Sequence, residues 1–226
     1  CCLSILLFFS SCQTPVLQFE YEKVPPESGF RMDGHWVWGG SMIKVGSTYH
    51  LFASRWAKRM DFPREYRFDS EIVRATSTSA TGPFKFEEVV IGERDSSYWD
   101  DNMAHNPTIH KIGDEFVLFY IGSDFTTYRE NTEYLLRLVG YARSKSIEGP
   151  WERSEQPLIA QESNNPAVLV EEDRVLLIFR DAPLRVYMAE SARYNGPYVV
   201  VNDTVWPECK LEDFYLFKSG GKYHFI

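Results

Sequence analysis

The hydrophobic positions of this chain fall in short runs separated by turns. Runs rich in β-branched and aromatic residues occur at 49–52, 116–120, 175–179 and 223–226, which is typical of β-strands. No stretch keeps a helical period over a dozen residues. The pattern therefore predicts an all-β protein built from hairpins.

A closing segment recurs three times, at 75–84, 142–151 and 189–198. Each copy has a small residue that leaves a strand, a polar loop, a Gly-Pro turn and then an aromatic residue. Glycine supplies a positive φ at the turn, and proline fixes its own φ. Three such segments in register indicate a structural repeat.

A second recurring piece precedes each closing segment and aligns Gly40, Pro107, Pro166 and Phe214 at equivalent positions. A period of about 50 to 65 residues with four strands in each unit is a signature of β-propellers. A β-sandwich, the alternative all-β architecture, does not predict this repetition. The sequence therefore predicts consecutive propeller blades.

The expected organisation is a signal-peptide remnant at 1–12, a linker at 13–30 and a propeller domain at 31–226. Blade 1 is expected at about 36–92, blade 2 at about 104–160, blade 3 at about 163–206, and the start of blade 4 at 211–226. A propeller ring must close to cover its sheet edges. Because the fourth copy stops after two strands, we expect a five-bladed propeller truncated at its C-terminus, with about three and a half blades.

The N-terminal segment has an apolar run at 3–9, too short to span a bilayer, followed by Ser10-Ser11-Cys12. Small residues directly before a cysteine are typical of a bacterial lipobox, which predicts export and lipidation of Cys12. The alternative is a buried N-terminal strand. Without the signal, Cys209 stands alone, so no disulfide framework or zinc spacing is predicted.

The charge balance narrows the kinds of molecule that the protein is expected to bind. Lys and Arg number 24 against 32 acids, a net charge of −8 without a block of like charge, which argues against nucleic acid as the main partner. The sequence has no glycine-rich phosphate loop, no Cys/His metal set and no Gly-x-Ser-x-Gly elbow. It predicts no cofactor and leaves open a structural calcium ion at the propeller axis.

Several short motifs occur in a distinctive order. They are Trp36-Val37-Trp38-Gly39-Gly40-Ser41, Trp99-Asp100, His105-Asn106-Pro107-Thr108-Ile109, Asn165-Pro166 and Glu212-Asp213. Together they resemble the five-bladed β-propeller glycosidases, which include glycoside hydrolase families 43, 32, 62 and 117, and in particular secreted Bacteroidetes lipoproteins. The resemblance implies a lipid-anchored protein of the periplasm or outer membrane of a Gram-negative bacterium, which contacts the membrane only through that anchor.

The resemblance also implies a funnel at one end of the axis, lined by the starts of the innermost strands, with three carboxylates on separate blades. Glycoside hydrolysis needs an acid to protonate the leaving oxygen and a carboxylate on the opposite face of the sugar. The candidates are Asp213, Glu212, Asp100 and Asp33. The alternative for Glu212 and Asp213 is a pair of solvated loop acids, and Asp33 would have to fold back to reach the funnel.

Other residues are candidates for substrate binding. They are Trp38, Trp99, His105, Asn106, Asn165, Arg55, Arg180 and Asp181. The tryptophans suit a sugar face, the histidine suits proton donation or a sugar contact, and the arginines suit a carboxylate. The alternatives are blade core for the tryptophans, Asn-Pro turns for the asparagines, a structural role for the histidine and ion pairs between blades for the arginines.

The predicted function is hydrolysis of plant or algal oligosaccharides by general acid–base catalysis, pairing Asp213 or Glu212 with Asp100 or Asp33. Characterised relatives often have Asp-Pro where this chain has Asn106-Pro107 and Asn165-Pro166, and asparagine cannot exchange a proton at neutral pH. A carbohydrate-binding propeller without catalysis is therefore the main alternative. A structural or protein-interaction propeller is a third, and it predicts no gathering of carboxylates.

Overall fold

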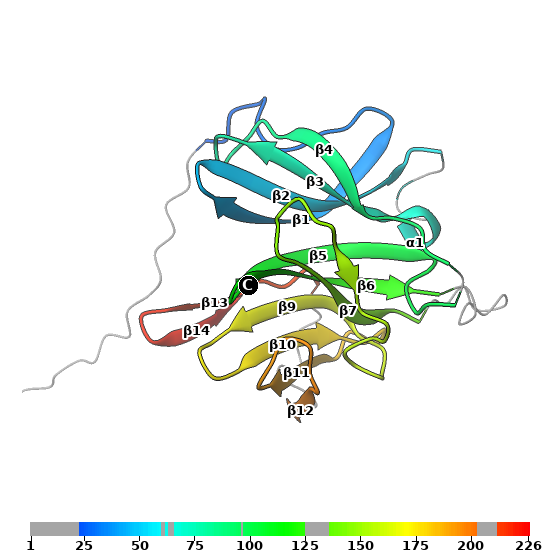
Figure 1. Ribbon diagram of the computed structural model, residues 1–226, viewed down its shortest axis with the longest axis vertical. Coiled ribbons are helices and arrows are strands. Elements are labelled where there is room, and N and C mark those ends of the chain that lie inside the picture. The colour runs from blue at the N-terminus through cyan, green and yellow to red at the C-terminus, as the bar shows by residue number, and fades with distance from the viewer. Residues whose placement is uncertain (1–22, 60–61, 63–65, 96, 125–135, 203–211) are drawn as a thin grey trace, which may run out of the picture.

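The computed structural model describes residues 23–59, 62, 66–95, 97–124, 136–202 and 212–226. Within these ranges the chain forms four antiparallel sheets and one short helix, α1 (Tyr66–Asp69), so the all-β expectation is confirmed (Figure 1). The expected signal remnant, including Cys12, lies outside the described residues. No helix in the described ranges is long and apolar enough to cross a membrane.

The four sheets follow one another along the chain. Sheet 1 contains β1 (His35–Val45), β2 (Thr48–Ala57), β3 (Glu71–Ser77) and β4 (Lys85–Ile91). Sheet 2 contains β5 (Met103–Ile112), β6 (Glu115–Ser123), β7 (Leu138–Ser144) and β8 (Glu152–Arg153). Sheet 3 contains β9 (Asn164–Val170), β10 (Val175–Arg180), β11 (Val186–Ser191) and β12 (Val199–Asn202), and sheet 4 contains β13 (Leu216–Ser219) and β14 (Lys222–Phe225).

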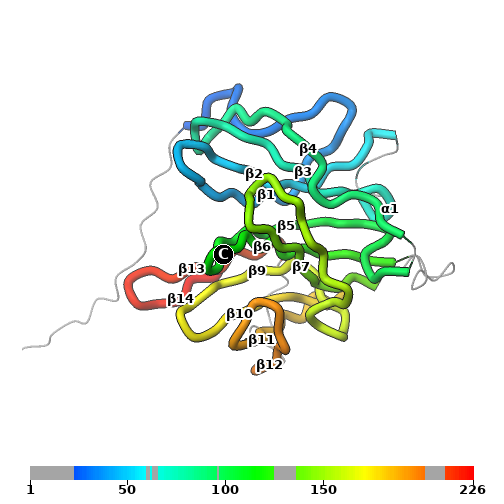
Figure 2. The backbone as a smooth tube through the Cα atoms, in the orientation of Figure 1, coloured from blue at the N-terminus to red at the C-terminus, as the bar shows by residue number. Residues whose placement is uncertain are grey.

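The first strand of each sheet contacts the first strand of the next. β1 contacts β5, β5 contacts β9, and β9 contacts β13, while the later strands of each sheet lie progressively farther out (Figure 2). This is the arrangement of consecutive propeller blades around an axis. The sheets of the described residues do not close into a ring.

Strand β6 shows why the apolar runs are continuous rather than alternating. Phe116, Leu118 and Tyr120 pack toward sheet 1, whereas Val117 and Phe119 pack toward sheet 3. Successive side chains of a strand point to opposite faces, so a blade covered on both sides buries every residue. Strand β10 repeats this between sheets 2 and 4.

The three closing segments have one geometry. Gly82, Gly149 and Gly196 have φ of 84°, 90° and 83°, and each is joined to its proline by a cis bond. Such a φ is strained for residues with a Cβ. The shared turn supports the repeat that was inferred from the sequence.

A buried ionic cluster joins the inner and outer parts of sheet 2. The Asp100 carboxylate accepts hydrogen bonds from Arg153 at 2.6 and 2.9 Å, from the Tyr120 hydroxyl at 2.6 Å and from Arg94 at 3.1 Å. Burial and the Asp100 charge raise the pKa of Tyr120. Beside it, the Trp99 ring lies against two glycines, Gly122 and Gly140, where added Cβ atoms would approach the ring within 2.6 Å and 2.2 Å.

The Asp100→Asn substitution should destabilise the protein because it leaves the Arg153 guanidinium buried without its counter-charge. Removing one partner of a buried ion pair costs about 3 to 5 kcal/mol, so we expect a loss of that size in the free energy of unfolding, measured by urea denaturation. The control Glu152→Gln removes the acceptor of an exposed pair with Arg143 and should cost less than about 1 kcal/mol. Equal losses in the two variants would contradict this role of Asp100.

Candidate functional site

Four residues at equivalent positions in the four sheets share an unusual backbone conformation. Gly39, Asn106, Asn165 and Asp213 have φ of 56°, 47°, 51° and 56°. This left-handed region is accessible to glycine and, among other residues, favours asparagine and aspartate. The same four residues directly precede the positions that the sequence alignment equated, so the structure supports that alignment.

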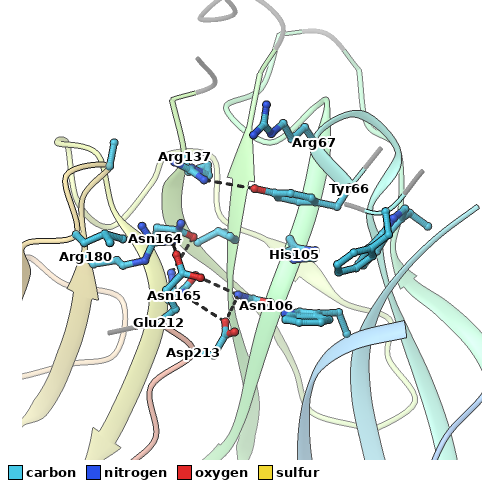
Figure 3. Close-up of a pocket in the computed structure, with 16 residues that line it drawn as sticks. Tyr66, Arg67, His105, Asn106, Arg137, Asn164, Asn165, Arg180, Glu212 and Asp213 are labelled. Atoms are coloured by element: carbon cyan, nitrogen blue, oxygen red, sulfur yellow. Dashed lines mark hydrogen bonds and ion pairs between the residues drawn. The ribbon is translucent and has the colours of Figure 1, made fainter. Parts of the chain in front are cut away.

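The polar side chains at these positions meet at the axis and bond to one another. The Asn106 amide donates to Asn165 Oδ1 at 3.1 Å and to Asp213 Oδ1 at 2.9 Å, and the Asn165 amide donates to the same Asp213 oxygen at 3.2 Å (Figure 3). We call Asn106, Asn165 and Asp213 the axial triad. It draws one side chain from each of three sequence repeats.

A cavity of about 500 Å³ lies above the axial triad. It is lined by Trp38, Trp56, Phe62, Tyr66, Arg67, His105, Asn106, Ile121, Arg137, Asn164, Asn165, Arg180, Ala182, Leu184, Glu212 and Asp213. A second cavity, of about 480 Å³, is lined by the triad and by inner-strand residues from β1 and β5. The axial triad thus lines both cavities.

One wall of the first cavity is aromatic and comes from β1, β2 and the segment between β2 and α1. Trp38 and Phe62 are 43% and 45% exposed, with ring centroids 5.6 Å apart. Trp56 is buried behind them and stacks on Phe62 at 5.9 Å. Exposed aromatic faces suit the apolar C–H face of a sugar ring.

The floor of the cavity holds two neighbouring carboxylates in different surroundings. Glu212 is ion-paired with the Arg180 guanidinium at 2.6 Å. Burial and the Glu212 charge raise the pKa of Asp213, although hydrogen bonds from Asn106 and Trp38 and the Arg180 charge oppose the rise. Asp213 Oδ1 accepts both amide donors of the axial triad. Carboxylates whose surroundings differ in this way are typical of acid–base sites.

His105 lines the cavity, and its imidazole ring is neutral. The Ser70 hydroxyl donates to the Ala104 carbonyl at 3.0 Å, and its Oγ lies 2.8 Å from His105 Nδ1. Because the hydroxyl hydrogen is used in this way, Nδ1–H of His105 donates to Ser70 Oγ. Burial and the Arg137 charge lower the pKa of His105 to about 3. The lowered pKa of His105 does not support its expected role as a proton donor at neutral pH.

Trp99 and Asp100, which the sequence predicted to be in the site, lie elsewhere in the structure. Asp100 is 1% exposed within its ionic cluster, and Trp99 is 7% exposed against Gly122 and Gly140. Neither lines the cavity. The expected catalytic role of Asp100 and the expected sugar contact of Trp99 are thus not supported by their positions.

Three further candidates also lie outside the cavity. Arg55 pairs with Glu71 at 2.6 Å inside sheet 1, and Asp33 is exposed before β1. Burial would raise the pKa of Asp181, but hydrogen bonds from Arg185 and Tyr187 lower it. Of the candidates from the sequence, the cavity brings together Trp38, His105, Asn106, Asn165, Arg180, Glu212 and Asp213.

Several cavity residues were missed by the sequence analysis. Tyr66 and Arg67 come from α1, between the second and third strands of sheet 1, and Arg137 directly precedes β7. These positions lie outside the two recurring pieces of the repeat. Asn164 was detectable, since it directly precedes the Asn165-Pro166 step.

A calcium ion at the axis would need oxygen ligands other than the carboxylates of the described residues. No group of three or more His, Cys, Asp or Glu side chains among them is arranged to hold a metal ion. The axial triad offers one carboxylate, and its members already bond to one another. Calcium takes six to eight oxygen ligands.

No protein-family model matches the sequence, and no curated protein matches it either. Solved structures do match. A family 117 glycoside hydrolase from Zobellia galactanivorans has 17% identity and a TM-score of 0.61, with 83% of this chain and 59% of that one covered. A GH43_1 enzyme from Xanthomonas citri, complexed with xylotriose, has 14% identity and a TM-score of 0.64, with 88% and 67% covered.

An exo-β-1,3-galactanase from Phanerochaete chrysosporium, complexed with β-1,3-galactotriose, has 16% identity and a TM-score of 0.59, with 83% of this chain and 42% of that one covered. The chain therefore shares the fold of these glycoside hydrolases, which is the fold that the sequence resemblance implied. The chain spans less than two thirds of the length of the family 117 enzyme.

The Gly39→Ala substitution tests the packing at the axis. A Cβ at Gly39 would lie 2.4 Å from Asn106 Oδ1, whereas a Cβ at Gly46 would meet nothing within 4 Å, and both residues have nearly the same φ. Since Asn106 is held by the triad, we expect Gly39→Ala to lower the free energy of unfolding by about 1 to 3 kcal/mol more than the control Gly46→Ala. Thermal or urea denaturation measures both, and equal losses would refute the close approach.

Proposed function

We propose that this protein is a glycoside hydrolase that acts on plant or algal oligosaccharides in the cavity above the axial triad. The observation that carries the proposal is the pair of dissimilar carboxylates in one cavity, Asp213 with a raised pKa and Glu212 paired with Arg180. The exposed aromatic wall and the fold shared with glycoside hydrolases support it.

In this mechanism Asp213 is the general acid. Its carboxyl group gives a proton to the leaving glycosidic oxygen, and the axial triad holds that group in one orientation throughout. Glu212 remains a carboxylate beside Arg180 and stabilises the positive charge that develops on the sugar or activates water. The sugar ring stacks on Trp38 and Phe62.

A carbohydrate-binding protein without catalysis is the second candidate function. It is favoured by Asn106 and Asn165, which place amides where the resemblance implies carboxylates. In the described part of the chain, Glu212 and Asp213 are the only carboxylates that line the cavity, and they are neighbours in sequence. Only a glycoside hydrolase releases sugar, so sugar release distinguishes the two functions.

We also propose the finer points of organisation that the sequence suggested. The complete ring has five blades, and this chain contributes three and the beginning of a fourth, which is supported by its coverage of 59% and 67% of two propeller enzymes. The protein is exported and anchored through lipid on Cys12, as its first residues suggest.

The Asp213→Asn substitution tests the proposed chemistry. General acid catalysis contributes about a hundredfold or more to the rate, so we expect at least that loss of sugar release from whichever plant or algal oligosaccharide the wild type cleaves, with binding retained. Reducing-end assays and calorimetry measure the two quantities. The control Asp33→Asn, outside the cavity, should leave turnover unchanged.

Sugar binding without turnover in the wild type, and no effect of Asp213→Asn on that binding, would end the enzyme hypothesis and leave the binding function.

The pH profile of turnover gives a separate test of Asp213 as the acid. The Asn106 hydrogen bond lowers the pKa of Asp213, so Asn106→Gly, which keeps the left-handed backbone accessible, should raise that pKa. An acid must be protonated to act, so activity falls as pH rises through its pKa. We therefore expect the alkaline limb of the profile to move to higher pH, and an unmoved limb would contradict the assignment.

A further inference from the structure

The cavity carries more positive charge than a site for neutral sugars needs. Arg67, Arg137 and Arg180 line it, against the carboxylates of Glu212 and Asp213. The whole chain has a net charge of −8. The arginines are therefore a local feature of the cavity and do not follow from the composition.

Arg180 is fixed by its partners, but they do not use all of its hydrogen-bond donors. Its guanidinium donates to Glu212 at 2.6 Å and to the Asp181 carbonyl at 3.2 Å, and its side chain is 7% exposed. Its Nε is buried without a partner among the described residues. A guanidinium has five N–H donors. Because Nε is buried, the Nη hydrogens outside these two bonds are the ones left for a ligand.

Arg137 is held more loosely. Its Nη2 lies 3.3 Å from a Glu162 oxygen and its Nη1 lies 3.5 Å from the Tyr66 hydroxyl, both at the long end for hydrogen bonds. Its Nε also lacks a partner among the described residues. Figure 3 shows Arg137 and Arg180 on the same side of the cavity, near Asn164 and across from His105.

The Arg137 and Arg180 guanidinium groups each already have one carboxylate partner, Glu162 for Arg137 and Glu212 for Arg180. Burial lowers the pKa of Arg180, the Glu212 charge opposes this, and the smaller effect of the Arg137 charge lowers it further. His105 is neutral and offers no counter-charge. An anion between the two arginines would give each a second negative partner and would accept their unused Nη hydrogens.

We propose that the cavity binds a sugar that carries an anionic group, held between Arg137 and Arg180 while the sugar ring lies on Trp38 and Phe62. This rests on the proposed function for the place of binding. A uronic-acid carboxylate fits best, because its two oxygens match the planar fork of a guanidinium. A sulfate ester shares the chemistry, so the test includes both.

Calorimetry on the Asp213→Asn variant tests the proposal, since that variant keeps the ligand intact and the result does not depend on turnover. The probes are oligomers of galacturonate, glucuronate and mannuronate, the same oligomers with their carboxyl groups reduced to alcohols, and sulfated galactan oligosaccharides. We expect a uronate to bind at least about tenfold more tightly than its reduced form, since charged hydrogen bonds are worth that much. Preference for the sulfated probes would assign the site to sulfate esters instead of uronates and would overturn the carboxylate assignment.

Substitutions then locate the anion. Arg137→Gln and Arg180→Gln should each weaken binding of the anionic probe by about 10- to 100-fold, and Arg137→Lys should restore part of the loss. The control Arg143→Gln removes an arginine of the outer part of sheet 2 and should leave binding unchanged. Equal affinity for charged and reduced probes, binding of none of them, or insensitivity to both Gln variants would overturn the proposal.

Discussion

A left-handed backbone at one equivalent position of the four repeats is the constraint on which the site depends. This position lies at a register shift within β1, β5 and β9 and just before β13. The left-handed backbone turns Asn106, Asn165 and Asp213 toward one point, where their side chains bond to one another. Gly39 completes the set, because a Cβ there would collide with the Asn106 side chain. Only glycine, asparagine and aspartate accept this backbone readily, so the four positions combine a backbone requirement with polar side chains at the axis.

The packing of the sheets keeps that geometry fixed. Strands β6 and β10 are covered on both faces, so each sheet is held by its neighbours and cannot slide without exposing apolar side chains. The Asp100 cluster ties the outer strand of sheet 2 to its centre. A site built on such elements is preorganised, which acid catalysis requires, because the acid must already be aligned with the leaving oxygen.

The repeat was the part of the fold that the sequence predicted best, since turns and strand starts depend on local residue preferences. It also predicted which residues meet at the axis, and Glu212 and Asp213 were chosen for that reason. Asp100 was misjudged because its neighbour Trp99 suggested a sugar surface, whereas the pair is buried against the glycines of β6 and β7. Arg137 and Tyr66 could not be predicted, because they reach the cavity from outside the repeated pieces.

The proposed acid catalysis depends most on the protonation of Asp213. Burial and the neighbouring Glu212 charge raise the pKa of this residue. Carbon-13 NMR of aspartate carboxyl groups, followed through a pH titration and assigned with Asp213→Asn, measures this directly. We expect the pKa of Asp213 to lie above its ordinary value of 3.8. Titration at or below that value would contradict its assignment as the acid of this site.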